Sequence, residues 1–463
     1  MNSKGNSTRP FGIADKLGYM FGDFGNDFTF LLSSAFLMKF YTDVMGVSAG
    51  VVGIMMMAAR IADAFTDVTM GQICDRSRPT AKGKFAPWLR RMCGPVAVAS
   101  LLMYASWFEN MSMTFKIVWM FVTYLLWGSV FYTSINIPYG SMASAISPEA
   151  KDRQELSSWR TIGATLANTV IGVVLPLVVY YEDAAGNQVM SGSAMSAAAV
   201  VCSVCAVICY LLCYYMTTER VKIQQETEKF SLAKLVKYLF SNRALIGIIA
   251  AAIMLLLAQL TLSGMAQYIY PNYFRSKEAI SVYTGCTSIL TIALAAVVPS
   301  LAARIGKKEL AVSGAFFGAA ALAVGFILHT DNLAVWLMIN LLAYLGIAFF
   351  NIVCWAMITD VIDDAEVRTG KRADGTIYAA YSFARKLGQA ASSGLMGGLL
   401  TLIGYTQATA FDPDVTDGIY NITCIVPGIG FLLLALALAF IYPLNRKKVD
   451  ENVAYLKAKR EKN

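Results

Sequence analysis

Long apolar runs recur along the whole chain, and they limit what this sequence can fold into. Twelve runs of 17 to 31 residues alternate with polar segments over the 463 residues. A run of about 20 apolar residues crosses the hydrocarbon core of a bilayer as one helix. Only 15% of the residues are charged, whereas a soluble domain carries about 25%. The sequence therefore predicts an all-α, multi-pass membrane protein and excludes a soluble enzyme, a nucleic-acid-binding protein and a disordered scaffold.

The predicted transmembrane helices are twelve, and basic residues give their orientation. They are Ile13–Tyr41, Ala49–Cys74, Met92–Phe108, Ile117–Ile146, Leu156–Tyr181, Ala194–Met216, Ala244–Tyr270, Ala279–Ala303, Leu310–Leu328, Leu333–Val361, Gly375–Tyr405 and Gly418–Tyr442. Of the 38 Lys and Arg residues, 30 lie in segments on the side of the N-terminus and only four lie on the opposite side. Because basic loops remain in the cytoplasm, we expect both termini there. The first twelve residues lack an apolar core, so we expect no cleavable signal peptide.

A polar segment at the middle of the chain divides the twelve helices six and six. The predicted parts are a six-helix bundle at 1–216, a linker with an interfacial helix at 217–243, a second bundle at 244–445 and a basic tail at 446–463. Short motifs recur between the halves, since Asn136-Ile137 returns as Asn351-Ile352. Two six-helix repeats of this kind resemble the major facilitator transporters, whose substrate site lies near the membrane midplane between the halves.

Cysteine and histidine do not indicate a metal centre. The chain has nine cysteines and one histidine. The Cys202-x-x-Cys205 pair lies in an apolar run without a turn, so we interpret these cysteines as small apolar packing residues rather than zinc or disulfide ligands. His329 is expected in a loop rather than in a proton relay. We expect no cofactor other than a coupling ion.

Eight ionisable residues lie within or close to apolar runs, where burying each charge costs about 3 kcal/mol. They are Asp23, Asp27, Arg60, Asp63, Asp67, Arg160, Arg385 and Lys386. Asp63 and Asp67 are four residues apart, so both carboxylates share one helix face with Thr66 beside them. Two like charges so placed favour a bound proton or cation between them. Thr133 and Asn136 are expected to add oxygen ligands, and the structural alternative is pairing with Arg60.

Other embedded residues are candidates for binding a sugar or for gating. Asp27 and Lys386 lie near the middles of the first and eleventh helices and suit hydrogen bonds to sugar hydroxyls, although a salt bridge between the halves is the plainer alternative. Asp23 fits ligand contact, gating and packing equally well. The aromatic candidates for stacking on a sugar ring, or for packing alone, are Tyr132, Tyr139, Trp355, Tyr378 and Tyr381. The coupling or gating candidates are Arg60, Asp75, Arg76 and Arg385.

Several motifs, in order along nearly the whole chain, resemble the glycoside, pentoside and hexuronide cation symporters, which include the melibiose and glucuronide carriers. The motifs are Asp15-Lys-Leu-Gly-Tyr-Met-Phe-Gly-Asp-Phe-Gly-Asn-Asp27, Ala59-Arg-Ile-Ala-Asp-Ala-Phe-Thr-Asp67, Gly83-Lys-Phe-Ala-Pro-Trp88, Asn136-Ile-Pro-Tyr-Gly140 and Arg372-Ala-Asp-Gly375 through Arg385-Lys-Leu-Gly-Gln389.

The resemblance carries roles onto particular positions. By similarity to the melibiose carrier, Asp63, Asp67 and Thr133 fall on the cation site. Asp27 and Arg160 fall on sugar-contacting positions, and Lys386 falls on a lysine that links the two sites. Two positions depart from that carrier, because Asn136 stands in place of its aspartate and Gly140 in place of its tryptophan. The motifs of the fourth and eleventh helices look closer to the glucuronide and pentoside carriers.

These observations predict a symporter of the bacterial inner membrane. It would couple inward movement of H⁺ or Na⁺ to uptake of a glycoside by alternating access, as a monomer in the lipid bilayer. The embedded groups balance at four negative and four positive charges, so one bound cation leaves a positive excess that favours an acidic sugar such as a hexuronide. The alternatives are a neutral oligosaccharide or pentoside symporter, a non-transporting sugar sensor, a lipid transporter and a membrane enzyme; short loops argue against the last.

The predicted orientation can be tested by labelling. A cysteine that replaces Ser77 should resist a membrane-impermeant thiol reagent in intact cells and react after permeabilisation, because its loop carries six basic residues from Arg76 to Arg91 and should be cytoplasmic. A cysteine that replaces Lys277 should react in intact cells. Labelling of the Ser77→Cys protein in intact cells would overturn the topology.

Overall fold

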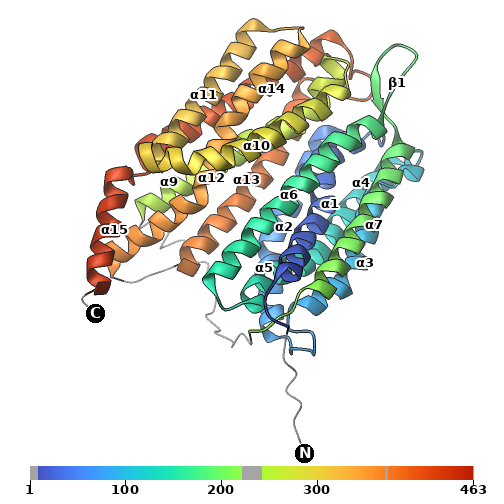
Figure 1. Ribbon diagram of the computed structural model, residues 1–463. Helices are drawn as coiled ribbons and strands as arrows, with labels where there is room; N and C mark the ends of the chain where they lie inside the picture. The colour runs from blue at the N-terminus through green and yellow to red at the C-terminus, as the bar shows by residue number, and fades with distance from the viewer. Residues whose placement is uncertain (1–8, 222–241, 371–373, 462–463) are drawn as a thin grey trace, which may run out of the picture. The chain divides into compact units, whose positions relative to one another are not determined.

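The computed structural model describes residues 9–221, 242–370 and 374–461, and these form twelve long helical segments (Figure 1). The side chains of residues 75, 150, 374–376, 378, 379, 460 and 461 are not described. The chain divides into two compact units, Met1–Glu228 and Lys229–Asn463. We call these unit 1 and unit 2 and describe each by itself.

Unit 1 contains the first six helical segments and a small hairpin. Its elements are α1 (Ile13–Asp43), α2 (Ala49–Arg76), α3 (Ala86–Met103), the short turn η1 (Ser106–Phe108), α4 (Met113–Leu125), η2 (Leu126–Tyr132), α5 (Thr133–Ile146), α6 (Ala150–Val179), β1 (Tyr180–Glu182), β2 (Gln188–Met190) and α7 (Gly192–Met216). The segment α4, η2 and α5 is one continuous span whose middle is a π-helical turn.

Unit 2 contains the other six segments and a terminal helix. Its elements are α9 (Arg243–Tyr268), η3 (Ile269–Tyr273), α10 (Glu278–Ile305), α11 (Lys307–Leu328), α12 (Leu333–Thr369), α13 (Asp374–Leu402), α14 (Pro413–Leu436), η4 (Ala437–Ile441) and α15 (Arg446–Glu461). The segment predicted as an interfacial helix, with its apolar positions between residues 230 and 240, lies outside the described residues. The tail predicted after Asn445 is helical, and its Asn452 and Leu456 are buried.

The helices match the twelve predicted spans, with informative differences at their ends. Nine helices in the described part of the chain are long and apolar enough to cross a membrane, and α1, α3 and α13 fall short of that apolar measure. α12 continues eight residues beyond the predicted Val361, because acidic residues can extend a helix into water, and it ends at Gly370 with φ +72°. α3 begins six residues earlier than predicted, with Pro87 in its first turn, where proline is tolerated.

A two-stranded antiparallel hairpin is the exception to the all-α prediction. β1 and β2 pair Tyr180 with Met190 and Glu182 with Gln188. Asp183 accepts hydrogen bonds from the backbone N–H groups of Ala185 and Asn187 (2.9 and 2.8 Å). The polar loop after α6 therefore closes on itself before α7 begins.

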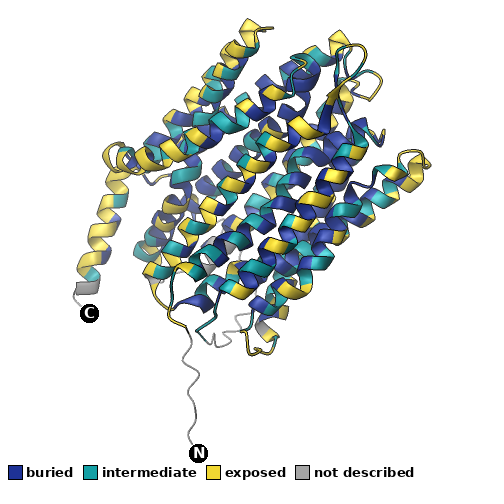
Figure 2. Cartoon of the chain, turned by 45° about the vertical axis from the view of Figure 1, so that its right-hand side comes forward, coloured by how far each residue is buried: buried dark blue, intermediate teal, exposed yellow. Residues whose placement is uncertain are grey.

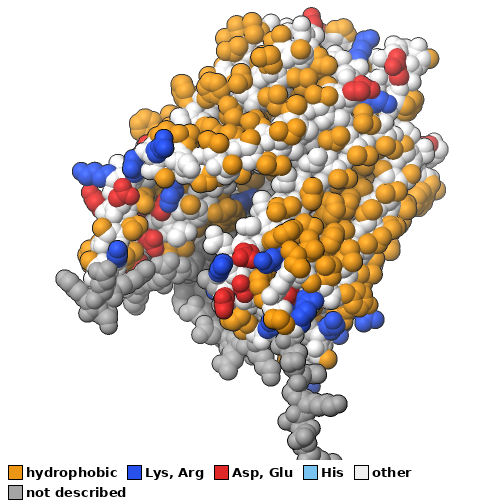
Figure 3. All heavy atoms as spheres, in the orientation of Figure 1, with side chains coloured by type: hydrophobic (Ala, Val, Ile, Leu, Met, Phe, Trp, Pro, Cys, Tyr) orange, Lys and Arg blue, Asp and Glu red, His pale blue; other side chains and the backbone are white. Residues whose placement is uncertain are grey.

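Many residues on the outside of the helices are exposed (Figure 2), and apolar side chains cover much of the surface seen in Figure 3, as expected in a bilayer. On α6 the exposed apolar residues include Ile162, Leu166, Val170 and Val174, a spacing that forms one stripe along the helix. Charged side chains gather toward the helix ends in Figure 3. Such exposed stripes are the lipid-facing surface, since a membrane protein needs no polar cover there.

Within unit 1, close contact of helix backbones depends on three glycines. A Cβ at Gly22 would lie 2.3 Å from the ring of Tyr139, and one at Gly163 would lie 2.6 Å from the carbonyl oxygen of Met20. Gly25 similarly faces the backbone of Ala206 at 3.2 Å. α1 therefore packs tightly against α5, α6 and α7, and this packing fixes the position of the acidic residues that α1 carries.

Polar contacts tie together the helix ends of unit 1 that lie near the start of α1 and the end of α7. The fully buried carboxylate of Asp15 accepts hydrogen bonds from Arg220 (2.9 Å) and from the backbone N–H of Thr218 (3.0 Å). Glu219 accepts from the backbone N–H groups of Lys84, Phe85 and Ala86 at 2.6 to 2.9 Å, so it caps the start of α3. Burial raises the pKa of Glu219, and the three N–H donors oppose that rise.

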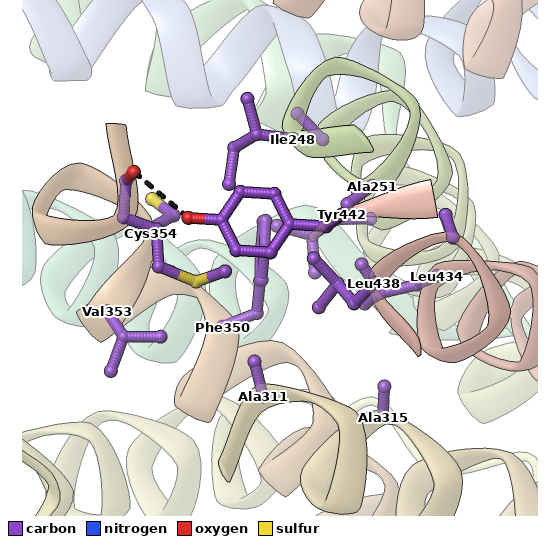
Figure 4. Close-up of a cluster of buried hydrophobic side chains, with 14 of the residues drawn as sticks. Ile248, Ala251, Ala311, Ala315, Phe350, Val353, Cys354, Leu434, Leu438 and Tyr442 are labelled. Atoms are coloured by element: carbon purple, nitrogen blue, oxygen red, sulfur yellow. Dashed lines mark hydrogen bonds between the residues drawn. The ribbon is translucent and has the colours of Figure 1, made fainter. Parts of the chain in front are cut away.

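The core of unit 2 sets the rotation of α12. Phe350, Val353 and Cys354 of α12 pack among residues of α9, α11 and α14 (Figure 4). The hydroxyl of Tyr442 donates to the carbonyl oxygen of Met357 (3.3 Å), as the dashed line in Figure 4 shows. Because these residues hold one side of α12, neighbouring positions such as Asn351 must point around the helix to another side.

The close approach of α6 to α1 predicts a stability effect. Gly163→Ala should destabilise the protein by about 1–3 kcal/mol, because the new methyl group meets a backbone carbonyl that cannot rotate away. Thermal unfolding in detergent measures the change. Gly94→Ala in α3 is the matched control, since nothing lies within 4 Å of its new Cβ, and it should be neutral or slightly stabilising. Equal unfolding temperatures for the two variants would contradict the packing described here.

Candidate functional site

Asp63 and Asp67 of α2 contact the middle of the fourth span. The hydroxyl of Ser129 donates to Asp63 Oδ1 (2.6 Å), and the hydroxyl of Thr133 donates to Asp67 Oδ1 (2.8 Å). Thr133 also lies 3.1 Å from the carbonyl oxygen of Gly128. A π-helical turn widens the helix locally and is frequent at functional sites. Here it brings two hydroxyls and a backbone carbonyl beside two carboxylates, an all-oxygen cluster in the middle of unit 1.

Arg60 lies one turn before Asp63 on the same helix. Its guanidinium is 3.4 Å from Asp63 Oδ2, and both residues are buried. The guanidinium carbon also lies 5.0 Å from the ring centroid of Phe30, a cation–π contact. The structural alternative for Asp63, pairing with Arg60, is therefore present. Asp63 also binds Ser129, so the ion pair is only part of its environment.

Asn136 takes part in a chain of hydrogen bonds between amide and hydroxyl groups, and not in a hydrogen bond to either of the two described aspartates of α2. Its Oδ1 accepts from Asn26 Nδ2 (3.4 Å), and Asn26 Oδ1 accepts from the hydroxyl of Tyr210 (2.9 Å). This chain crosses from the fourth span through α1 to α7. Asn136 is thus held at one turn from Thr133, on the side where α1 passes.

Asp23 and Arg160 form an ion pair between α1 and α6. Arg160 Nε donates to Asp23 Oδ1 (2.8 Å), and the guanidinium lies 5.5 Å from the ring centroid of Tyr139. Tyr139 is fully buried and stacks on Tyr19 at 4.6 Å, so in this arrangement its ring packs against protein. Asp27, one turn beyond Asp23, receives no hydrogen bond or ion pair from any other described residue. Its carboxylate is the acceptor that remains available near Arg160.

The candidate residues of unit 2 form a second group. The guanidinium of Arg385 lies 5.7 Å from the ring of Trp355 and 6.0 Å from that of Tyr381, and the two rings meet edge to face at 5.4 Å. Asn351 Nδ2, one turn before Trp355, donates to Gln259 Oε1 of α9 (3.1 Å). This amide pair joins the first and fourth helices of unit 2, as Asn26 and Asn136 do in unit 1.

The remaining predicted residues have less defined environments. The Thr66 hydroxyl donates back to the carbonyl of Asp63 (3.3 Å), and Tyr132 is half-buried beside the rings of Phe30 and Trp127. Lys386 is half-buried, and Arg76 is exposed at the end of α2. The side chains of Asp75 and Tyr378 lie outside the described part. The coupling and gating roles predicted for Arg60, Asp75, Arg76 and Arg385 stay predictions.

Sequence reasoning missed several polar partners. Ser129 lies four residues before Thr133, a spacing that could have marked it as sharing a helix face. Asn26 lies next to Asp27 in the quoted motif, and a polar side chain beside an embedded aspartate could have marked it. The count of embedded charges also omitted two pairs that the structure shows, Lys39 with Asp43 (2.8 Å) and Lys307 with Asp360 (2.7 Å). Each of these two pairs is neutral, so they add no net charge to the count.

The fold and the polar groups held within its spans define a multi-pass membrane transporter of the major facilitator type. The solved structure of a D-xylose–proton symporter has the same fold, with a TM-score of 0.63 and 14% sequence identity over 93% of this chain and 98% of that chain. Residues 18–446 match the family model described as MFS/sugar transport protein, and the chain belongs to this family. The protein is therefore a membrane transporter and not an enzyme.

Two relatives lie within the group suggested by the sequence motifs, which confirms that resemblance. The chain is 30% identical to a protein of Escherichia coli (strain K12) named glucuronide carrier protein homolog, over 94% of each chain. It is also 30% identical to the isoprimeverose transporter of Lactiplantibacillus pentosus, over 92% of this chain and 88% of that one. These relatives support sugar transport.

Proposed function

We propose that this protein is a cation-coupled sugar symporter of the bacterial inner membrane, and that it favours an acidic sugar such as a hexuronide. The observation that carries the coupling is the oxygen cluster of unit 1. Ser129 donates to Asp63 and Thr133 donates to Asp67, and the Thr133 hydroxyl also lies within hydrogen-bond distance of the Gly128 carbonyl. Oxygen ligands of this kind suit Na⁺ as well as a proton shared between carboxylates.

Coupling requires that the cation change the affinity for sugar. The cation cluster and the sugar candidates are linked through the fourth span, because Thr133 contacts Asp67 and Asn136, three residues on, contacts Asn26 beside Asp27. A cation that draws Asp67 and Thr133 together would shift the fourth span, and Asn136 of that span is hydrogen-bonded to Asn26 of α1. We infer that this shift prepares Asp27 and Arg160 for the sugar.

The charges of the embedded residues support an acidic substrate. Of the eight embedded charges counted from the sequence, unit 1 holds four carboxylates and the guanidinium groups of Arg60 and Arg160, whereas unit 2 holds Arg385 and Lys386. A bound cation leaves one positive charge in excess. An unbalanced charge in a low-dielectric environment is costly, so a substrate carboxylate would stabilise the loaded state. The name of the glucuronide carrier homologue agrees in kind, and a neutral pentoside, as in the isoprimeverose transporter, is the alternative.

Removal of either carboxylate should abolish coupling. Asp63→Asn and Asp67→Asn should each eliminate accumulation of sugar against its gradient, because one carboxylate cannot hold the cation alone, while sugar exchange between equal pools persists. Uptake and exchange of a labelled glucuronide in membrane vesicles, with imposed Na⁺ or proton gradients, measure both activities and identify the ion.

The hydroxyl that donates to Asp63 provides a graded variant and a matched control. Ser129→Ala should weaken the apparent cation affinity about tenfold, since hydrogen bonds to charged groups contribute about 1.5–3 kcal/mol. Ser134→Ala removes a nearby hydroxyl that donates to the Val130 carbonyl (2.6 Å) and should have little effect. Full concentrative uptake by both aspartate variants would eliminate the proposed cation site.

The preference for acidic sugar should depend on Asn136. Asn136→Asp adds one negative charge and can still accept the hydrogen bond from Asn26, so it should lower the preference for a glucuronide over the matched neutral glucoside by about tenfold or more. Competition between the two glycosides for uptake measures the preference. If the neutral glycoside competes equally in the wild type, or if Asn136→Asp leaves the preference unchanged, the charge-balance argument fails while the sugar symporter remains.

A further inference from the structure

Arg385 of unit 2 is a cation that lies against the rings of Trp355 and Tyr381, which we call the aromatic platform. It lies 11 residues from the start of α13, about 16 Å along the helix, and thus deep within a span. Its guanidinium lies 5.7 Å from the centroid of the Trp355 ring and 6.0 Å from that of the Tyr381 ring. Within the described residues no carboxylate forms an ion pair with Arg385, although a membrane arginine ordinarily has an anionic partner or faces water.

The helix geometry shows that Arg385 does not face lipid. Leu387, two residues later, is 39% exposed, and a spacing of two residues places it about 160° around the helix from Arg385. Gly388 packs on α9, where its Cβ would lie 3.3 Å from Leu256. Because Gly388 is three residues after Arg385, it lies only about 60° around the helix. Arg385 therefore lies next to the α9-packed side of α13 and away from the exposed side marked by Leu387.

The same conclusion holds for the platform. Trp355 is 44% exposed, and Leu342, an exposed apolar residue of the same helix, lies about 140° away around it. The buried side of α12 is occupied by Phe350, Val353 and Cys354 (Figure 4). The exposed part of Trp355 therefore belongs to a third side of α12, which it shares with Asn351 one turn earlier.

These groups have the chemistry that a binding site for an acidic sugar requires. A guanidinium binds a carboxylate through two parallel hydrogen bonds, and its own position is fixed by stacking on Trp355. One turn away, the half-buried amides of Gln259 and Asn351 use one donor and one acceptor on each other, so each retains further hydrogen-bonding capacity for hydroxyl groups. No other described guanidinium of unit 2 combines an aromatic platform, depth in a span and the absence of an ion pair.

We propose that Arg385 binds the carboxylate of an acidic sugar and sets the preference for uronides over neutral sugars, with Asn351 and Gln259 binding the hydroxyls. This inference rests on the proposed sugar transport and identifies the residue that recognises the negative charge of the substrate. It differs from the role in coupling or gating suggested by sequence alone, because a gating residue would affect acidic and neutral sugars alike.

Binding by the purified full-length protein tests the proposal without relying on transport. The probes are p-nitrophenyl β-D-glucuronide and p-nitrophenyl β-D-glucoside, measured by equilibrium dialysis in detergent. Arg385→Gln should weaken glucuronide binding by about 10- to 100-fold, the range expected for a charge-assisted hydrogen bond, and should change glucoside binding less than about twofold. Arg385→Lys, which keeps the charge but loses the planar stack, should lie between.

Controls separate the specific effect from net charge and from folding. Arg275→Gln removes one positive charge from an exposed loop position of unit 2 and should leave both affinities unchanged. Asn351→Ala should weaken both glycosides to the same extent, because hydroxyls are common to both. Thermal unfolding of each variant establishes that it is folded. If Arg385→Gln does not fold, the glycoside affinities of Arg385→Lys test the proposal.

The outcomes distinguish this inference from the proposed function. Equal losses for both glycosides in Arg385→Gln, or no loss for either, overturn the assignment of Arg385 while sugar binding stands. A wild-type protein that binds glucoside but not glucuronide overturns this inference and the acidic-sugar preference together. Glucuronide binding that depends on Arg385 but not on any cation supports the inference and contradicts the coupling alone.

Discussion

Charge inside a membrane span is the constraint on which the rest of this structure depends. Each ionised group there must be neutralised, hydrogen-bonded or exposed to water. Unit 1 meets this requirement with ion pairs, since Arg160 binds Asp23 and Arg60 binds Asp63. Hydroxyls complete the environment of the two α2 carboxylates. Asp27 has neither kind of partner among the described residues, and Arg385 in unit 2 lies against aromatic rings with no ion pair to any carboxylate in the described part of the chain. We propose each of them, within its own unit, as a candidate for contact with a substrate.

Close helix packing makes these pairings possible. The glycines of α1 and α6 let backbones approach until a methyl group would collide with a carbonyl or a ring. Such contacts of small residues drive helix association in lipid, where burial of apolar area alone gives little advantage. With α1 fixed in this way, Asn26 reaches both Asn136 and Tyr210, and Asp23 reaches Arg160. The packing of apolar backbone surfaces thus sets the distances between the polar groups.

The two units share one kind of polar contact between helices and differ in the charges around it. An amide pair joins the first and fourth helical segments in each, Asn26 with Asn136 in unit 1 and Gln259 with Asn351 in unit 2. The sequence repeat of Asn-Ile predicted this correspondence at one partner of each pair. Around the amides, unit 1 is rich in carboxylates, whereas unit 2 carries Arg385 and Lys386. The carboxylates of unit 1 suit a bound cation, and the basic residues of unit 2 suit an acidic sugar.

The sequence by itself determined the membrane class, the positions of the long helical segments and the family, because length and apolarity of a run decide whether it enters a bilayer, and the motifs are local in the chain. It also identified the embedded charges, since each is conspicuous within an apolar run. Tertiary structure alone decided the partners. Ser129 reaches Asp63 because a π-helical turn widens the fourth span, and Arg385 stacks on Trp355 because the core of unit 2 fixes the rotation of α12. Distances between helices and rotations about their axes arise from packing over the whole unit, and no local pattern of residues encodes them.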